Sequence, residues 1–96
     1  MLEKDYQAKL IKKIKSRLPE SIVMKQDANY KQGVPDLIIL NKNNWAALEV
    51  KQSAKASKRP NQEYYVDKMN SMSYASFIFP ENEEDVLNAM EQALQR

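Results

Sequence analysis

The alternation of apolar and polar residues divides this chain into helical and extended segments. Apolar residues at positions 6, 10, 11, 14 and 18 have the spacing of one helix face and predict a helix over residues 3–18. Helical spacing returns from Pro60 to about Ser71 and again from Asn82 onward. Short apolar runs bounded by turn residues predict strands at 21–25, 37–40, 45–51 and 74–79. The order helix, strand, strand, strand, helix, strand, helix predicts an α/β fold, with a mixed sheet of about four strands flanked by helices.

The second and third predicted strands form a hairpin across an Asn-rich break. A symmetrical two-residue turn pairs Leu40 with Trp45 and, counting outward, Asp36 with Glu49. Lys51 leaves the same face as Glu49, because side chains two apart in a strand share a face. Carboxylates directly opposite one another have Cβ atoms about 5 Å apart and repel unless a cation lies between them. A divalent metal and the Lys51 ammonium are both candidates, and an ordinary hairpin with solvated charges is the alternative.

The absence of two residue types narrows the possible chemistry. The 96 residues include no histidine and no cysteine, which excludes the usual zinc sites, a Ser-His-Asp triad and a Cys-His dyad. Any metal would therefore be held by oxygen ligands, which magnesium and manganese prefer. Proton transfer would use carboxylate, lysine, tyrosine or a water bound to the metal.

Charge is distributed unevenly along the chain. Residues 1–59 carry 13 basic and 6 acidic residues, a net charge of +7, whereas residues 60–96 carry 2 basic and 7 acidic residues, a net charge of −5. The hairpin lies in the basic part, so we expect a phosphate-rich partner near its carboxylates. The last helix begins with Asn82-Glu83-Glu84-Asp85. Negative charge at a helix start complements the helix dipole, so we interpret the three acidic residues as capping residues.

The length predicts a single domain over residues 1–96, small enough that a second copy of the chain would help to bury a core. No run approaches the roughly 18 apolar residues that a membrane span needs. The charged N-terminus lacks the apolar stretch of a signal peptide, and the lack of cysteine fits a reducing compartment. We therefore expect a cytoplasmic protein.

Three further residues stand out by their positions. Glu3 extends the inward stripe of the first helix, as an N-terminal residue favoured by the dipole or as a metal ligand. Gln62 is the polar member of the inward stripe of the second helix, and it either caps that helix or reaches the reacting groups. The rest of that stripe is Tyr65, Val66, Met69 and Met72. Gly33 is the single glycine. It indicates a position that needs a positive φ angle or a close approach of the backbone, and a loop residue chosen for flexibility is the alternative.

Pro35-Asp36 on one strand and Glu49-Val50-Lys51 on the next resemble the motif of the PD-(D/E)XK nuclease superfamily. The predicted element order also matches the core of that superfamily. The lead Gly33-Val34-Pro35-Asp36-Leu37 and the helix start Pro60-Asn61-Gln62 look most like the virus-type replication-repair nuclease (VRR-NUC) branch. The resemblance covers residues 3 to about 80. It departs at Met72-Ser73-Tyr74, where that branch often has a glycine, and this puts the turn between helix and strand in doubt.

The resemblance implies a restriction-endonuclease-like core and a metal-dependent endonuclease that hydrolyses phosphodiester bonds in DNA. Compact stand-alone members occur in phages and bacteria and act as homodimers on branched DNA, such as Holliday junctions or flaps, in replication, recombination or repair. The implied cofactor is Mg²⁺ or Mn²⁺, with no organic cofactor. A nucleic-acid-binding protein on a nuclease scaffold, without catalysis, is the alternative, and a small interaction domain with incidental hairpin charges is a third reading.

The resemblance also implies a ligand set for the metal. Asp36 and Glu49 would bind it together with the backbone carbonyl of Val50. Glu3 occupies the place where some relatives supply another acidic ligand from the first helix.

The resemblance also implies roles for the side chains around the metal. Lys51 would orient the attacking water or neutralise charge that develops on the phosphate. Gln62 matches a second-helix glutamine placed near the reaction centre. The residues expected to contact DNA phosphates are Lys31, Lys55, Lys58 and Arg59.

Overall fold

The computed structural model describes residues 2–27 and 29–96. Its elements, in chain order, are α1 (Glu3–Arg17), β1 (Ile22–Lys25), β2 (Leu37–Asn41), β3 (Asn44–Val50), α2 (Pro60–Met72), β4 (Tyr74–Ile78) and α3 (Glu83–Leu94). This is the predicted order, and the last strand ends one residue earlier than predicted. None of the helices in the described ranges has both the length and the apolar character needed to cross a membrane.

The four strands form one sheet in the order β1-β2-β3-β4. Strands β1, β2 and β3 pair with one another in antiparallel fashion, whereas β4 lies parallel to β3 after the crossover through α2. In the hairpin, Leu40 pairs with Trp45 and Asn41 with Asn44, so the predicted register is confirmed. The sheet is therefore mixed, as predicted.

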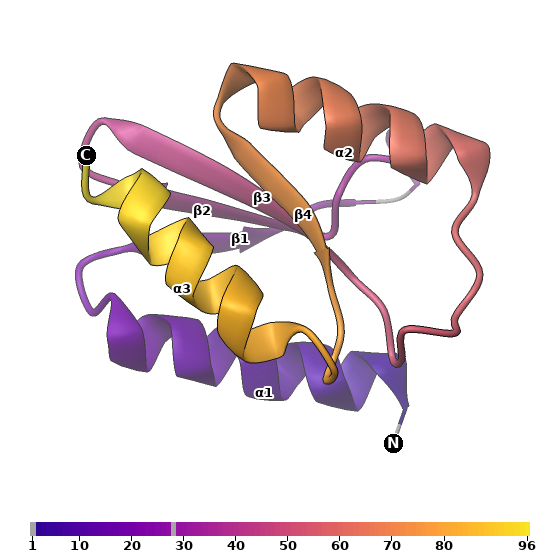
Figure 1. The fold of residues 1–96 in the computed structure, drawn as a ribbon, viewed down its shortest axis with the longest axis horizontal. Helices are drawn as coiled ribbons and strands as arrows, with labels where there is room; N and C mark the ends of the chain where they lie inside the picture. The colour runs from indigo at the N-terminus through magenta and orange to yellow at the C-terminus, as the bar shows by residue number, and fades with distance from the viewer. Residues whose placement is uncertain (1, 28) are drawn as a thin grey trace.

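Helices cover both faces of the sheet (Figure 1). Helices α1 and α3 lie on one side, where alternate residues of β2 and β3 meet them. Helix α2 lies on the other side and packs on β3 and β4. The larger core forms beneath α1 and α3, and its fully buried side chains include Leu10, Ile14, Leu37, Ile39, Leu48, Val50, Ile78, Leu87, Met90 and Leu94. The smaller core, beneath α2, is built around Ala47, Val66 and Ala75.

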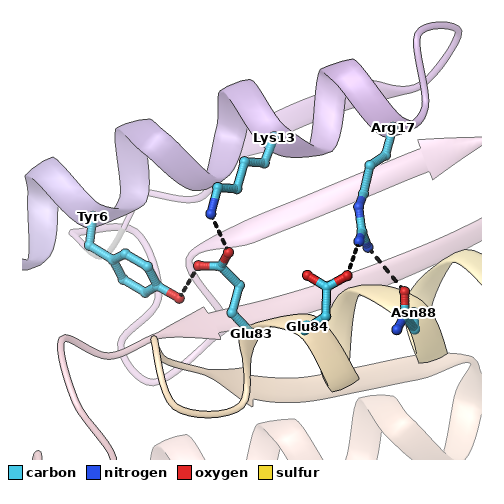
Figure 2. A network of polar contacts seen from close by, with 6 residues as sticks. All are labelled: Tyr6, Lys13, Arg17, Glu83, Glu84 and Asn88. Carbon is cyan, nitrogen blue, oxygen red and sulfur yellow. Dashed lines mark hydrogen bonds and ion pairs between the residues drawn. The ribbon is translucent and has the colours of Figure 1, made fainter.

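Polar contacts join α1 to the first turns of α3 (Figure 2). The Tyr6 hydroxyl donates to Glu83 Oε1 at 2.9 Å, and Lys13 pairs with the other oxygen of the same carboxylate. Arg17 pairs with Glu84 and reaches Asn88 Oδ1 at 3.4 Å. The acidic residues that begin α3 thus do more than complement its dipole, because they also hold the two helices together.

The end of α2 and the turn that follows it can be compared with the sequence-based prediction. Met72 was expected on the inward stripe, but it is 66% exposed. It is the last residue of α2 and directly precedes the turn into an edge strand, so no neighbouring element covers it. In that turn, Ser73 has a φ angle of −150°, so it does not need the left-handed backbone that favours glycine. Its hydroxyl donates to the carbonyl of Trp45, which ties the turn to the start of β3.

Candidate active site

The predicted acidic pair lies at one end of the β2–β3 hairpin, on the face that α2 covers. Extending the observed register by one residue places Asp36 opposite Glu49. Glu49 is only 3% exposed, because α2 packs over β3. Asp36 directly precedes β2, and its Oδ2 accepts a hydrogen bond of 2.9 Å from the backbone N–H of Val50. The hairpin thus brings the two carboxyl groups together from adjacent strands.

Gln62, in the first turn of α2, connects the acidic pair to the neighbouring lysine. Its Nε2 donates to Glu49 Oε2 at 3.0 Å, and its Oε1 accepts from Lys51 Nζ at 2.9 Å. The same Oε1 accepts the backbone N–H of Arg59, the N-cap residue, at 3.0 Å. Gln62 therefore both caps the helix and reaches the acidic pair. Because two donors fix its oxygen, its NH₂ group must point toward Glu49.

Lys51 continues from β3 on the same face as Glu49. Its side chain is almost fully buried, and Nζ lies 4.0 Å from Glu49 Oε2. Its backbone N–H donates to the carbonyl of Ile78 on β4 at 2.9 Å. The ammonium is thereby held beside the carboxylates by a backbone anchor and by Gln62.

The electrostatics of the pair favour protonation. Burial, followed by the neighbouring charge of Asp36, raises the pKa of Glu49 to about 8, and the Lys51 ammonium opposes this only in part. Burial also raises the pKa of Asp36, although the hydrogen bond from Val50 and the Lys51 ammonium act in the opposite direction. One ammonium therefore does not compensate two partly desolvated carboxylates.

The donor set fits a hard divalent cation. Glu49 Oε1 is buried and has no hydrogen-bond partner among the residues that the structure describes, although buried polar atoms are normally bonded. The N–H and C=O of a strand residue point to the same side, so the Val50 carbonyl faces the side on which Asp36 lies. Two carboxyl groups and a carbonyl are the oxygen ligands that Mg²⁺ and Mn²⁺ prefer.

Glu3 does not join the acidic pair as a third neighbour. Over residues 2–27 and 29–96, no three acidic side chains come close enough together to hold a metal ion. Glu3 is exposed, in the first turn of α1. Its charge nevertheless contributes to the raised pKa of Glu49, so it acts on the pair electrostatically without completing a ligand set.

The four basic residues predicted to contact DNA lie on the segments that flank the site. The Lys31 ammonium, in the loop before β2, lies 5.6 Å from the ring centre of Tyr65. The Lys58 ammonium lies 5.3 Å from the ring centre of Phe77 and 5.5 Å from that of Phe79. Such contacts position an ammonium without neutralising it. The other two basic residues, exposed between β3 and α2, are Lys55 and Arg59.

Gly33 holds the loop of residues 29–36 against α2. Its φ angle is 90°, and a Cβ atom there would lie 2.7 Å from Asn61 Nδ2. Positive φ and close approach therefore both apply at this position. The Gln26 N–H donates to the Asp36 carbonyl at 2.8 Å and closes the base of the loop. The loop that leads into Asp36 is thus docked on the helix that carries Gln62.

The contacts between aromatic rings and lysine side chains were not predicted from the sequence. The sequence pattern assigns Tyr65 only to an inward stripe, and Phe77 only to a strand. Their neighbours come from distant segments, so sequence spacing contains no signal for these contacts. The adjacent pair Tyr30-Lys31 is the local signal that could have drawn attention to an aromatic and basic surface.

No protein-family model and no curated protein sequence matches this chain. A solved structure described as a VRR_NUC domain is similar to it, with a TM-score of 0.59 and 16% sequence identity. The alignment covers 93% of this chain and 94% of that one. At this identity the likeness concerns the fold. The chain therefore has the fold of a VRR_NUC domain, the branch that its Pro35-Asp36 and Glu49-Val50-Lys51 residues resemble.

Proposed function

We propose that this protein is a metal-dependent endonuclease that hydrolyses phosphodiester bonds in DNA. One observation carries the proposal: two carboxyl groups meet on adjacent strands beside Lys51, and Glu49 Oε1 is buried without a partner among the described residues. A purely structural role would leave two desolvated acids with only one nearby ammonium. The likeness to a VRR_NUC domain adds support for a nuclease-type function.

In this proposal the cation, Mg²⁺ or Mn²⁺, is held by Asp36, Glu49 and the backbone carbonyl of Val50. Glu3 is not part of this ligand set, because it does not come close enough to the acidic pair to share a metal ion with it. When bound, such a cation lowers the pKa of a water molecule and offsets negative charge on the scissile phosphate. Its charge would also relieve the repulsion within the acidic pair.

The protein's own side chains orient the reaction. Lys51 presents an ammonium next to the acidic pair, where it can orient the attacking water or stabilise charge that develops on the phosphate. Gln62 holds that ammonium and the Glu49 carboxylate in fixed relative positions through one amide group. These hydrogen bonds hold both side chains beside the acidic pair, so little reorganisation is required when the phosphate binds.

The flanking basic residues bind the DNA backbone in this proposal. One of them precedes β2 in the sequence, and the other three lie between β3 and α2. They are Lys31, Lys55, Lys58 and Arg59. Contacts to phosphates position DNA without reading its sequence. We further propose that the substrate is branched DNA, such as a Holliday junction or a flap, and that the enzyme acts in the cytoplasm of a bacterium or of a phage-infected cell.

The proposal is tested by offering four-way junction, flap, duplex and single-stranded DNA with Mg²⁺, Mn²⁺ or EDTA. We expect cleavage with either metal, none with EDTA, and faster cleavage of junction and flap than of duplex. Asp36→Asn is the control for a contaminating nuclease and should be inactive. If the wild-type protein binds these DNAs but cuts none of them with either metal, the non-catalytic binding protein is the correct alternative.

We also propose that a second copy of the chain is the protein partner, docked on the half of the sheet that α2 leaves open. There Ile22 is 59% exposed and Met24 is 42% exposed, on the same face of edge strand β1. The charge change Met24→Glu should convert a dimer to a monomer in sedimentation experiments, while Ala89→Glu on the exposed side of α3 should not. A wild-type protein that sediments as a monomer at high concentration would rule the dimer out.

A further inference from the structure

Two tyrosine side chains project into solvent from the segments that build the candidate site. Tyr30 is 90% exposed and Tyr64 is 60% exposed. Tyr30 belongs to the loop of residues 29–36, which leads into Asp36, and Tyr64 belongs to α2, which carries Gln62. Rings this exposed add little to the buried apolar core, so packing does not explain both of them.

Contacts between side chains link these segments next to the site. The Tyr64 and Tyr65 rings meet edge to face, with centres 5.1 Å apart and planes at 77°. The Lys31 ammonium lies 5.6 Å from the centre of the Tyr65 ring. Tyr65 follows Gln62 by three residues on the same helix, so the two share a face with Cβ atoms about 5–6 Å apart. The aromatic contacts therefore begin about one helical turn from Gln62, the residue that bonds to Glu49.

We propose that Tyr30, Lys31 and Tyr64 form a binding surface for an unpaired nucleotide, with a tyrosine ring stacked on its base and the Lys31 ammonium on its phosphate. This inference rests on the proposed nuclease function and specifies the part of the DNA that is recognised. Every base has a π face that can stack on an aromatic ring, but bases within a duplex are already stacked on each other. The surface therefore discriminates by pairing and not by base identity.

Two contacts connect the loop and the helix that carry this surface to the rest of the site. Gly33 packs against Asn61, and the base of the loop is closed between Gln26 and Asp36. Tyr65 is half buried, and its ring meets the Tyr64 ring edge to face.

The test measures DNA binding in EDTA, so that it does not depend on cleavage. Probes are a blunt duplex and the same duplex with a short single-stranded flap that carries 2-aminopurine. We expect Tyr30→Ala and Tyr64→Ala each to weaken flap binding about ten-fold and to leave duplex binding within about two-fold. Wild-type protein should quench the 2-aminopurine emission on binding, and the alanine variants should quench it less. Tyr30→Phe and Tyr64→Phe keep the ring and should behave like the wild type.

Three results would overturn the inference: equal losses on flap and duplex, no loss on either, or phenylalanine variants as weak as the alanine variants. The last would mean that the hydroxyl groups, not the rings, make the contact. A failure of the proposed nuclease function would be seen separately, as a wild-type protein that does not cleave with Mg²⁺ or Mn²⁺.

Discussion

Glu49→Gln is expected to abolish DNA cleavage and, in the same protein, to raise the free energy of unfolding. The amide keeps an oxygen to accept from Gln62 and removes a carboxylate whose ionised form is desolvated and faces Asp36. In the proposed function that carboxylate holds the cation. We therefore expect a cleavage rate lower by at least about 100-fold, together with a stability gain on the order of 2 kcal/mol at pH 8.

The pH dependence of the stability follows from the direction in which the pKa of Glu49 is shifted. The pKa of Glu49 is raised from an ordinary value of 4.5 to about 8 in the folded protein, so the folded state binds more protons than the unfolded state between these values. The free energy of unfolding of the metal-free wild type should therefore fall as pH rises from about 4.5 through about 8. The Glu49→Gln protein should lack the part of this decrease in the free energy of unfolding that Glu49 contributes.

Urea unfolding across this pH range, in EDTA, measures the stability, and cleavage assays in Mg²⁺ measure the activity. Glu63→Gln makes the same chemical change at an exposed position of α2 and should alter neither quantity by much. A Glu49→Gln protein that is less stable than the wild type at pH 8 would contradict the electrostatic account. One that still cleaves at the wild-type rate would contradict the assignment of Glu49 to the site.

Lys51→Met is expected to lower turnover far more than DNA affinity. The Lys51 side chain is nearly buried, and its ammonium is held by Gln62 Oε1 at 2.9 Å, so it can contribute little to diffuse attraction of DNA. Its position beside the acidic pair suits a charge that forms only in the transition state. Removing one such group should slow cleavage about 100-fold or more, whereas the Kd for DNA should change by less than about three-fold.

Single-turnover cleavage with enzyme in excess separates the chemical step from binding, and fluorescence anisotropy in EDTA gives the Kd. Lys55→Met is the matched comparison, because this lysine is exposed in the segment between β3 and α2 and should affect affinity and its salt dependence instead. If both lysine variants lose affinity and keep the single-turnover rate, Lys51 is a DNA-binding residue and not a catalytic one.

The hairpin is the part of the structure that sequence patterning could predict. Its register depends on a two-residue turn and on the alternation of buried residues, and both are visible in the sequence. The opposition of Asp36 and Glu49 follows from that register alone. The helices around it follow from 3.6-residue periodicity and from the prolines at their ends. Local sequence signals are therefore sufficient to predict the hairpin, the helices and the pairing of the two acidic residues.

Contacts between distant segments were not predictable in the same way. The helical stripe places Gln62 inward but does not indicate that its amide bonds to Lys51, Glu49 and the N-cap together. The pairing of Tyr6 with Glu83 joins residues 77 positions apart, and it depends on how α1 packs against α3. Met72 was misplaced because periodicity does not indicate where the covering element ends.

The alternation of side chains along β2 and β3 has a consequence beyond stability. Leu37, Ile39 and Leu48 lie on the opposite face from the candidate site, yet by filling the core they decide which face of the sheet receives Asp36 and Glu49. A slip of one residue between the strands would turn every side chain of one strand over. A misaligned hairpin would thus lose its packing and its chemistry together, so the molecule has no well-folded arrangement in which the acids are parted.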